Sequence, residues 1–303
     1  MNKIIVISSI NMDIVSQVKT HPRPGETVKS SDFSYIPGGK GANQALAAHR
    51  LGGSVLMLGK VGSDAFGENL LQFYRKEGMN TDSIVVADNI STGAAFVAVD
   101  SSSENVIYVS AGANADLSFS DATHIQIEKG DIVSATLETP IEATKQLFDH
   151  ARKIGATTIL NAAPGNLDAE VIFPLVDYLI VNETELSVFS RTKIPKTKEE
   201  VIEAMKKLQK NIKNILTTLG SKGVVALIEG RVIACEGHKV NAVDTTAAGD
   251  CFVGAFAVAL QEGKAIKEAM DFANAAAAIS VQRLGASSSL PIRKDIEHGG
   301  FLD

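Results

Sequence analysis

The sequence predicts an α/β fold with a mostly parallel central sheet, and three observations support this prediction. Short apolar runs rich in β-branched residues alternate with segments whose apolar residues recur at helical spacing. The strand-like runs are apolar throughout, which is typical of strands covered by helices on both faces. The chain has 303 residues, 45% of them hydrophobic, and no composition break or internal repeat divides it. We therefore expect residues 1–303 to form one domain.

The expected strands are apolar runs, and the expected helices carry apolar residues every three to four positions. The first strand, residues 3–10, lacks the cleavage-site pattern of a signal peptide although it stands near the N-terminus. The other expected strands are 54–62, 131–138, 157–164, 177–182 and 214–220. The expected helices are 39–51, 64–78, 140–155, 183–190, 197–210, a helix after Gly249, and 265–285.

Two regions interrupt this order because they show strand patterns without helices. Residues 14–37 carry short alternating strands around a Pro/Gly turn, and residues 91–110 read as a hairpin. Together they could form a small separate sheet, whose apolar face would need a partner. A lid over a ligand or a dimer contact would supply that partner, and two ordinary surface hairpins are the alternative.

Composition and missing motifs argue against several classes of protein. The net charge is −6 without a Lys/Arg-rich run, so we expect no nucleic-acid partner, and no apolar run is long enough to predict a membrane span. Cys235 and Cys251 form no CxxC pair and indicate buried reduced thiols in a cytoplasmic protein. The chain has no GxxxxGK[ST], no GxGxxG after its first strand and no HExxH or histidine cluster. These absences disfavour a P-loop, a dinucleotide-binding turn and a zinc site.

A glycine-rich turn, PGGKGANQA at residues 37–45, leads into an expected helix. Glycines here could let backbone N–H groups approach a ligand, with Lys40 adding charge and Asn43 an amide; an ordinary helix start is the alternative. Asn11 and Asp13 are expected to end the first buried strand, at the edge where open α/β sheets bind ligands. Such polar groups suit a substrate rich in hydroxyls, although turn formation alone also explains them.

Polar residues also follow three later strands. Glu138 ends one of them, and Asn182 with Glu185 could hold a hydrated Mg2+, or could equally be a helix cap with its capping-box partner. The stretch TTLGSKG, residues 217–223, offers backbone donors and a hydroxyl, with a plain hairpin turn as the alternative.

The stretch VDTTAAGDCF, residues 243–252, places a carboxylate at a small-residue turn that begins a helix. Free N–H groups at residues 247–250 could hold a phosphoryl group in transfer. Asp250 could then accept a proton from an attacking hydroxyl. The alternative is that Asp250 only caps its own helix.

These motifs together resemble the ribokinase family, within the PfkB group of sugar kinases. GGKGANQA, NETE at 182–185 and DTTAAGD at 244–250 occur in the family's order, and the resemblance covers essentially the whole chain. It implies a three-layer α/β/α fold with a small β-sheet lid over the site, made of the two helix-free regions. It also implies ATP-dependent phosphorylation of the 5-hydroxyl of D-ribose and a homodimer formed through the lid. A kinase for 2-deoxyribose or another small sugar is the alternative, and a non-catalytic sensor is a third reading.

The resemblance also assigns roles to residues. Asp250 would be the catalytic base, with an anion hole at Ala247, Ala248, Gly249 and Asp250. Ribose would contact Asn11, Asp13, Gly39, Lys40, Gly41, Ala42, Asn43, Glu138 and Asp250. ATP, with Mg2+ near Glu185, would contact Asn182, Glu185, Thr218, Leu219, Gly220, Ser221, Lys222, Gly223, Gly249, Asp250 and Asn274. A monovalent cation, K+, would lie at Asp244, Thr246, Ser280, Arg283, Gly285 and Ser289.

Overall fold

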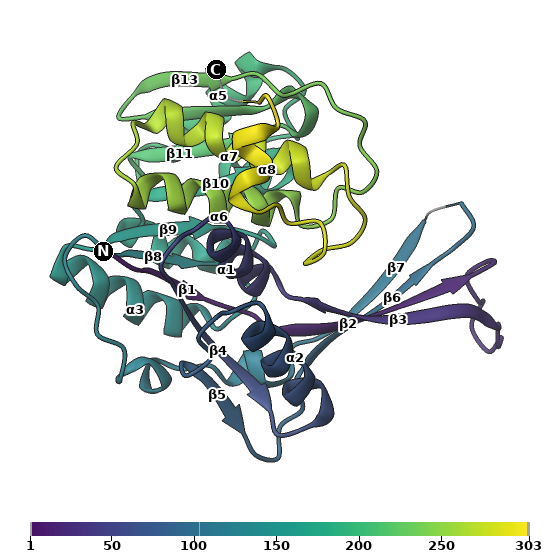
Figure 1. The fold of residues 1–303 in the computed structure, drawn as a ribbon. Coiled ribbons are helices and arrows are strands. Elements are labelled where there is room, and N and C mark those ends of the chain that lie inside the picture. Colours follow the sequence, from purple (N-terminus) through teal and green to yellow (C-terminus); the bar gives the residue numbers. More distant parts are fainter. Residues whose placement is uncertain (1, 103, 302–303) are drawn as a thin grey trace.

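The computed structural model describes residues 2–102 and 104–301. A nine-stranded sheet runs through the described part of the molecule in the order β13-β12-β11-β10-β9-β8-β1-β4-β5 (Figure 1). Neighbouring strands are parallel from β11 to β5, and only β12 and β13 run antiparallel to their neighbours. The strands are β1 (Ile4–Ile7), β4 (Val55–Gly62), β5 (Ile84–Ala87), β8 (Ile132–Ala135), β9 (Thr157–Asn161), β10 (Tyr178–Asn182), β11 (Asn214–Thr218), β12 (Val224–Ile228) and β13 (Arg231–Cys235).

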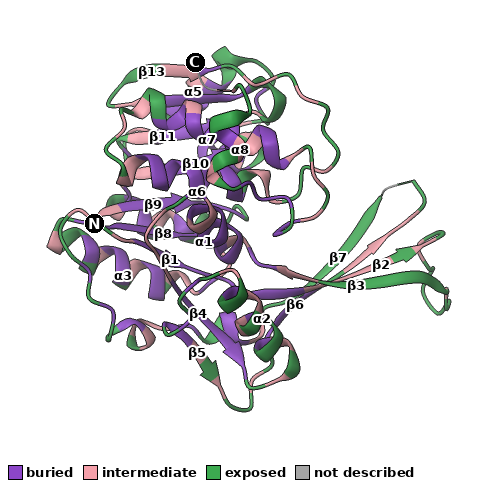
Figure 2. Ribbon diagram, viewed as in Figure 1, coloured by how far each residue is buried: buried purple, intermediate pink, exposed green. Residues whose placement is uncertain are grey.

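Helices cover both faces of this sheet, as the apolar strands predict. In β1, Ile4 and Val6 join one hydrophobic cluster while Ile5 and Ile7 join another, because successive side chains of a strand point to opposite faces. The first cluster contains α1 (Lys40–Arg50), α2 (Ala65–Lys76), α6 (Ala248–Gln261), α7 (Ile266–Ser280) and α8 (Arg293–His298). The second contains α3 (Ile141–Ile154), α4 (Glu183–Ser190) and α5 (Lys198–Leu208). Figure 2 shows the buried strands between these layers. The predicted three-layer α/β/α architecture is confirmed.

Some boundaries differ from the prediction. The first strand ends at Ile7, and the chain then enters β2 (Asn11–Val18) of a second sheet. The hairpin β12–β13, strand β5 and helix α8 were not predicted from the sequence. The turn 219–223 joins the antiparallel strands β11 and β12, which confirms the hairpin-turn reading of TTLGSKG.

The two helix-free regions form one small sheet that projects from the main body (Figure 1). It contains four strands in the order β3-β2-β6-β7, with β3 at Ser30–Gly38, β6 at Gly93–Val99 and β7 at Asn105–Ser110. The predicted second sheet is therefore confirmed, although it begins at Asn11. Large apolar side chains stay exposed on it: Phe33, Tyr35, Phe96, Ile107, Tyr108 and Val109. Figure 2 shows much of β3 and β7 in the green of exposed residues.

Within residues 2–102 and 104–301, no helix combines the length and the apolar character needed to cross a bilayer.

Candidate active site

Two neighbouring cavities lie where the carboxyl ends of β10 and β11 meet the N-terminus of α6. The larger has a volume of about 470 Å³ and the smaller about 340 Å³. Both are lined by Asn182, Thr218, Thr245 and Gly249, so the two are continuous around these residues. The larger is bounded on one side by apolar groups such as Phe252, whereas Asp250 lines the smaller. The pair could accommodate a ligand with an apolar end and a polar end.

The N-terminus of α6 is open toward these cavities. Ala247, with φ 60°, turns the chain into the helix, which begins at Ala248. Among the described residues, the backbone N–H groups of Ala247, Gly249 and Asp250 have no hydrogen-bond acceptor. A methyl group added at Gly249 would meet no atom within 4 Å. Free donors and the positive end of the helix dipole make this turn suitable for an anion.

Asp250 does not cap its own helix. The N-cap is Ala247, and Asp250 is the third residue inside α6 and is only 7% exposed. Its Oδ2 accepts a hydrogen bond from Asn43 Nδ2 at 3.2 Å, and its Oδ1 accepts one from Gln44 Nε2 at 3.2 Å. The alternative that Asp250 serves only as a cap is therefore wrong. Two consecutive residues of α1 hold the carboxylate instead.

The surroundings of Asp250 raise the pKa of its carboxyl group toward neutral pH. Burial raises the pKa of Asp250 to about 6, against the lowering effects of Lys40, Gln44 and Asn43 and with a further raising effect of Glu138. A carboxylate of this pKa is ionised at pH 7 and still basic enough to accept a proton.

The N-terminus of α1, by contrast, is occupied by groups of the protein itself. Lys40 N donates to Glu138 Oε2 at 3.0 Å, while the N–H groups of Gly41 and Ala42 donate to the hydroxyl and carbonyl oxygens of Ser9 at 3.3 and 3.1 Å. Ser9 Oγ also donates to Glu138 Oε2 at 2.6 Å. The N–H groups of Lys40, Gly41 and Ala42 therefore donate within the protein and are not free for a ligand, whereas the expected ribose contact of Gly39 stays a prediction.

The glycines of this turn are required by packing. A methyl group on Gly39, which has φ 95°, would lie 2.4 Å from Ser9 O, and one on Gly41 would lie 2.4 Å from Ser8 Cα. Only glycine lets the segment after β1 pass this close to α1.

Lys40 is the positive centre of the site. Burial lowers its pKa, but the carboxylates of Asp250, Glu138, Glu185 and Asp13 outweigh that effect and raise the pKa above its ordinary value. These carboxylates come from separate parts of the chain, namely β2, the loop after β8, α4 and α6.

Asn11 and Asp13 lie on β2, not at the end of β1 as the sequence predicted. Asn11 is held by Asn114, whose Nδ2 donates to Asn11 Oδ1 at 2.7 Å. Burial raises the pKa of Asp13 to about 7, and Glu138 raises it further while Lys40 lowers it. Two carboxylates near one ammonium group thus lie among the residues that are expected to contact a sugar.

Comparison with known proteins decides the family. The model of the pfkB family of carbohydrate kinases matches residues 1–293. The chain belongs to this family. A ribokinase of Haemophilus influenzae is 38% identical over 292 residues, covering 96% of this chain and 95% of the relative. A deoxyribokinase of Salmonella typhimurium is 33% identical over 292 residues, covering 95% of each.

Solved structures agree with this assignment. A ribokinase of Thermotoga maritima has a TM-score of 0.90 at 37% identity, covering 98% of this chain and 99% of the other. A ribokinase of Arabidopsis thaliana, solved with ribose and ATP, has a TM-score of 0.89 at 32% identity and covers 98% of both chains. The enzyme class of this pfkB-family chain is thus a ribokinase-like carbohydrate kinase.

Most residues expected to bind ATP line the two cavities of this kinase. Asn182, Thr218, Gly220, Ser221, Gly223, Gly249 and Asn274 line the larger one, and Glu185 lines the smaller one with Asp250. The predicted Asn182–Glu185 capping box is present, with reciprocal hydrogen bonds of 2.9 Å. Sequence reasoning missed the wall formed by Gly237, His238, Val240, Ala242, Phe252, Ala277, Ala278 and Val281. Apolar helix positions look alike whether they face a core or a cavity.

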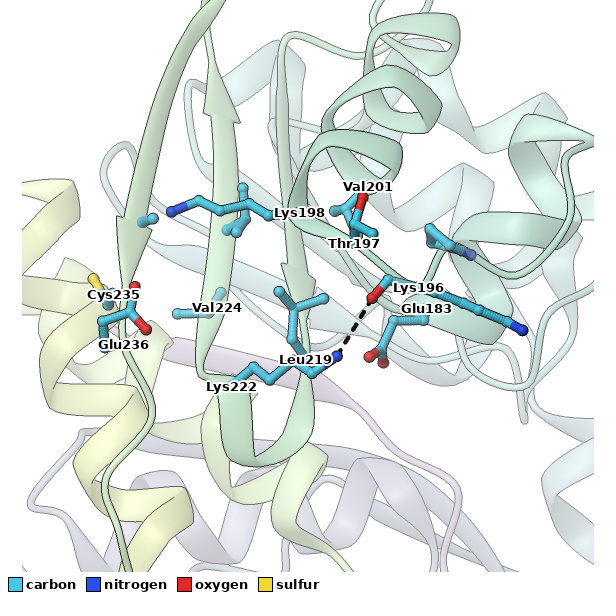
Figure 3. A pocket seen from close by; sticks show the side chains of 13 residues that line it. Glu183, Lys196, Thr197, Lys198, Val201, Leu219, Lys222, Val224, Cys235 and Glu236 are labelled. Atoms are coloured by element: carbon cyan, nitrogen blue, oxygen red, sulfur yellow. Dashed lines mark hydrogen bonds between the residues drawn. The ribbon is translucent and has the colours of Figure 1, made fainter.

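Leu219 and Lys222 line a different cavity of about 210 Å³, between the start of α5 and strands β12–β13 (Figure 3). In Figure 3 the Lys222 ammonium group points to the carbonyl oxygen of Lys196, to which it donates at 3.4 Å. The side chain of Lys222 is thus directed to the segment before α5.

Few side chains in the described part of this kinase are placed to ligate a metal ion. Within the described residues, no three His, Cys, Asp or Glu side chains are grouped as a metal site. Glu185 uses Oε2 to accept from Asn182 N. Burial raises the pKa of Glu185, opposed by that hydrogen bond and by Lys40. One carboxylate at a polar cavity fits Mg2+, which keeps several waters and takes its remaining ligands from phosphates.

The residues expected at the K+ site come together only in part. Asp244 Oδ1 accepts from the N–H and hydroxyl of Thr246, and Asp244 Oδ2 accepts from Gly285 N at 2.9 Å. This contact joins the loop before α6 to the loop after α7. Ser280 and Ser289 pair with each other at 2.9 Å, and Arg283 donates to Asp295 at 2.9 Å. Their side chains are engaged, so backbone carbonyl oxygens are the donors that fit a cation here.

Proposed function

We propose that the chain transfers the γ-phosphoryl group of ATP to the 5-hydroxyl of D-ribose, giving D-ribose 5-phosphate and ADP. The observation that carries this proposal is the position of Asp250, a buried carboxylate beside the unpaired N–H groups of the first turn of α6. Phosphoryl transfer depends on positioning, charge neutralisation and an oriented nucleophile. The free N–H groups of Ala247, Gly249 and Asp250 would hold the transferring group, and Asp250 would take the proton of the attacking hydroxyl. The N–H group of Ala248, which the sequence also placed in the anion hole, instead donates to Thr245 O at 3.3 Å.

ATP is assigned to the larger cavity, with its phosphates reaching the smaller one past Gly249. The apolar wall around Phe252 suits the adenine base of ATP, and the polar groups around Asn182 and Thr218 suit the ribose and the phosphates of ATP. Mg2+ would be held through water by Glu185 and by the phosphates, where it would neutralise their charge. K+ at the Asp244–Gly285 junction would order the turn that precedes Ala247.

The sugar is assigned to the side of Asp250 that carries Asn11, Asp13, Asn43 and Glu138. Carboxylates and amides can hydrogen-bond several hydroxyls of one sugar. The Arabidopsis thaliana relative was solved with ribose and ATP, which supports both ligands for this chain.

The small sheet is proposed to act as a lid over the sugar and as the contact of a homodimer. Asp13 and Asn11 stand on its strand β2, so the sheet reaches the sugar side directly. Paired positions place Tyr35, Phe96 and Tyr108 in one row across the sheet, and all three are exposed. Such an apolar row suits a second copy. We expect the enzyme in the cytoplasm, where its two free thiols stay reduced.

A kinetic panel tests the substrate. We expect kcat/KM for D-ribose to exceed that for 2-deoxyribose, fructose and nucleosides by roughly tenfold or more, because an unmatched buried polar group costs about 1–3 kcal/mol. 2-Deoxyribose is the second candidate, since one relative of similar identity is a deoxyribokinase. Comparable turnover of several sugars would remove the ribose assignment and leave the kinase assignment intact.

A further inference from the structure

Gln44 and Asn161 make a chain of side-chain amides that ends on Asp250. Asn161 Nδ2 donates to the carbonyl oxygen of Ile180 at 3.2 Å, and Asn161 Oδ1 accepts from Gln44 Nε2 at 3.1 Å. Gln44 Nε2 also donates to Asp250 Oδ1 at 3.2 Å. The proposed function gives neither amide a role, although Asn161 also lines the smaller cavity. Gln44 is 1% exposed and Asn161 is 7% exposed, so solvent offers Gln44 in particular no alternative partner.

The groups at the two ends of this hydrogen-bonded series fix which way each amide donates. A backbone carbonyl and an ionised carboxylate can only accept hydrogen bonds. Asn161 must therefore turn its NH2 group to Ile180, and Gln44 must turn its NH2 group to Asp250. Flipping either amide would place two acceptors or two donors against each other. The oxygen of Gln44 then faces Ser134 Oγ, a potential donor at 3.5 Å.

We propose that Gln44, held in place by Asn161, is a positioning residue that fixes the orientation of the Asp250 carboxylate and favours its ionised form. This inference rests on the proposed function, in which Asp250 is the base. Asn43, the neighbour of Gln44 on α1, holds the other carboxylate oxygen. Each oxygen of Asp250 thus receives one amide donor from α1.

The charged groups around Asp250 set the sign of the expected effect. Lys40 of α1 lowers the pKa of Asp250, and Glu138, from the loop after β8, raises it. The Cys251 thiol, next in α6, has its pKa raised by burial and by Asp250, so it stays neutral. Loss of the Gln44 donor removes one of the groups that lower the pKa of Asp250. The protonated form then persists to higher pH.

The test compares Gln44→Met, which keeps the length of the side chain without its amide, with Gln72→Met. Gln72 is a matched control because its amide also donates to a carboxylate, Glu68 Oε1 at 3.2 Å, but on the exposed surface of α2. In Gln44→Met we expect the acid limb of the kcat/KM profile to move up by roughly one pH unit, with about fivefold lower kcat/KM at pH 6. At pH 9 the rate should recover to within about threefold of the wild type, and Gln72→Met should match the wild type throughout.

A loss of equal size at pH 6 and pH 9, or an unmoved acid limb, would overturn the proposal, since a structural defect acts at every pH. Asn161→Ala provides a second variant should Gln44→Met fail to fold, and it should move the limb in the same direction. The assay uses the sugar that the wild type phosphorylates fastest, so a wrong sugar assignment appears in the wild-type panel alone.

A measurement without turnover separates the inference from the proposed function. NMR titration of 13Cγ-labelled aspartate, with Asp250 assigned by its absence in Asp250→Asn, should give a midpoint near 6 in the wild type. The midpoint should be higher in Gln44→Met. An identical midpoint in both proteins would overturn the role of Gln44 even in a chain whose substrate is unknown.

Discussion

The N-termini of α1 and α6 look alike in the sequence and differ in the structure. Both helices follow small-residue turns, GGKG and AAGD, of the kind that binds anions. In α1, Glu138 and Ser9 already take the first N–H groups, and backbone atoms surround Gly39 and Gly41. In α6, Ala248 N donates to Thr245 O at 3.3 Å, but the N–H groups of Gly249 and Asp250 have no acceptor in the part of the chain that the structure describes.

This difference shows that glycine serves two purposes in one site: it allows close packing at α1 and leaves open space at α6. The glycines of α1 allow the segment after β1 to pass close to the helix, and the carboxylate of Glu138 serves as the anion of that helix end. Gly249 of α6 has no neighbour to avoid, which leaves room for a ligand. We infer that α1 builds the sugar side and that α6 receives the phosphoryl group.

The largest effect should follow from Asp250→Asn, which removes the base at the open helix end. We expect kcat to fall by about 10²–10⁴-fold, because a positioned general base contributes that much. Ribose binding by calorimetry should remain measurable. The control is Glu200→Gln, which neutralises an exposed carboxylate at the third position of α5. Wild-type-like turnover in Asp250→Asn would show that Asp250 is not the catalytic base.

A smaller effect concerns the pH profile of the wild type. The base must be ionised, and the pKa of Asp250 is raised to about 6, so activity should be lost as the pH falls through 6. We expect kcat/KM to drop about fivefold between pH 6 and pH 5. Initial rates from pH 4.5 to 9 measure this, and a profile flat down to pH 4.5 would contradict the environment assigned to Asp250.

The smallest effect concerns stability on the sugar side. The pKa of Asp13 is raised to about 7 from an ordinary 3.8, so the folded chain keeps a proton that the unfolded chain releases. Stability from this group is therefore lost as the pH rises between these values. Asp13→Asn should raise Tm at pH 8 by roughly 2–4 °C and by less at pH 5. Scanning calorimetry at both pH values measures it, and an equal shift at both would count against the shifted pKa.

Periodicity and motif order predicted much of the fold and the candidate site. Apolar runs located β1, β4 and β8 to β11, and helix spacing located α1 to α7, because burial on fixed faces leaves a local pattern. Strands β12 and β13 were missed, although the runs VVALI and RVIAC flank the two-residue turn Glu229–Gly230, a hairpin pattern.

The departures at the site arise from contacts between distant segments. The local sequence around Asp250, a small-residue turn before a helix, is also typical of a helix cap. Only the packing of α1 against α6 brings the amides of Asn43 and Gln44 to its carboxylate. Asn161 and Asn114 escaped prediction because no local motif marks an amide whose partner is more than a hundred residues away.

The most direct test of the difference between the two helix ends compares Gly249→Ala with Gly41→Ala. In Gly249→Ala the methyl group enters open space in a helix, so Tm should hold or rise while kcat falls, since the methyl group takes the space of the phosphoryl group. In Gly41→Ala the methyl group would lie 2.4 Å from Ser8 Cα, so the protein should lose about 1–3 kcal/mol of stability. Full activity in Gly249→Ala, or unchanged stability in Gly41→Ala, would contradict this account.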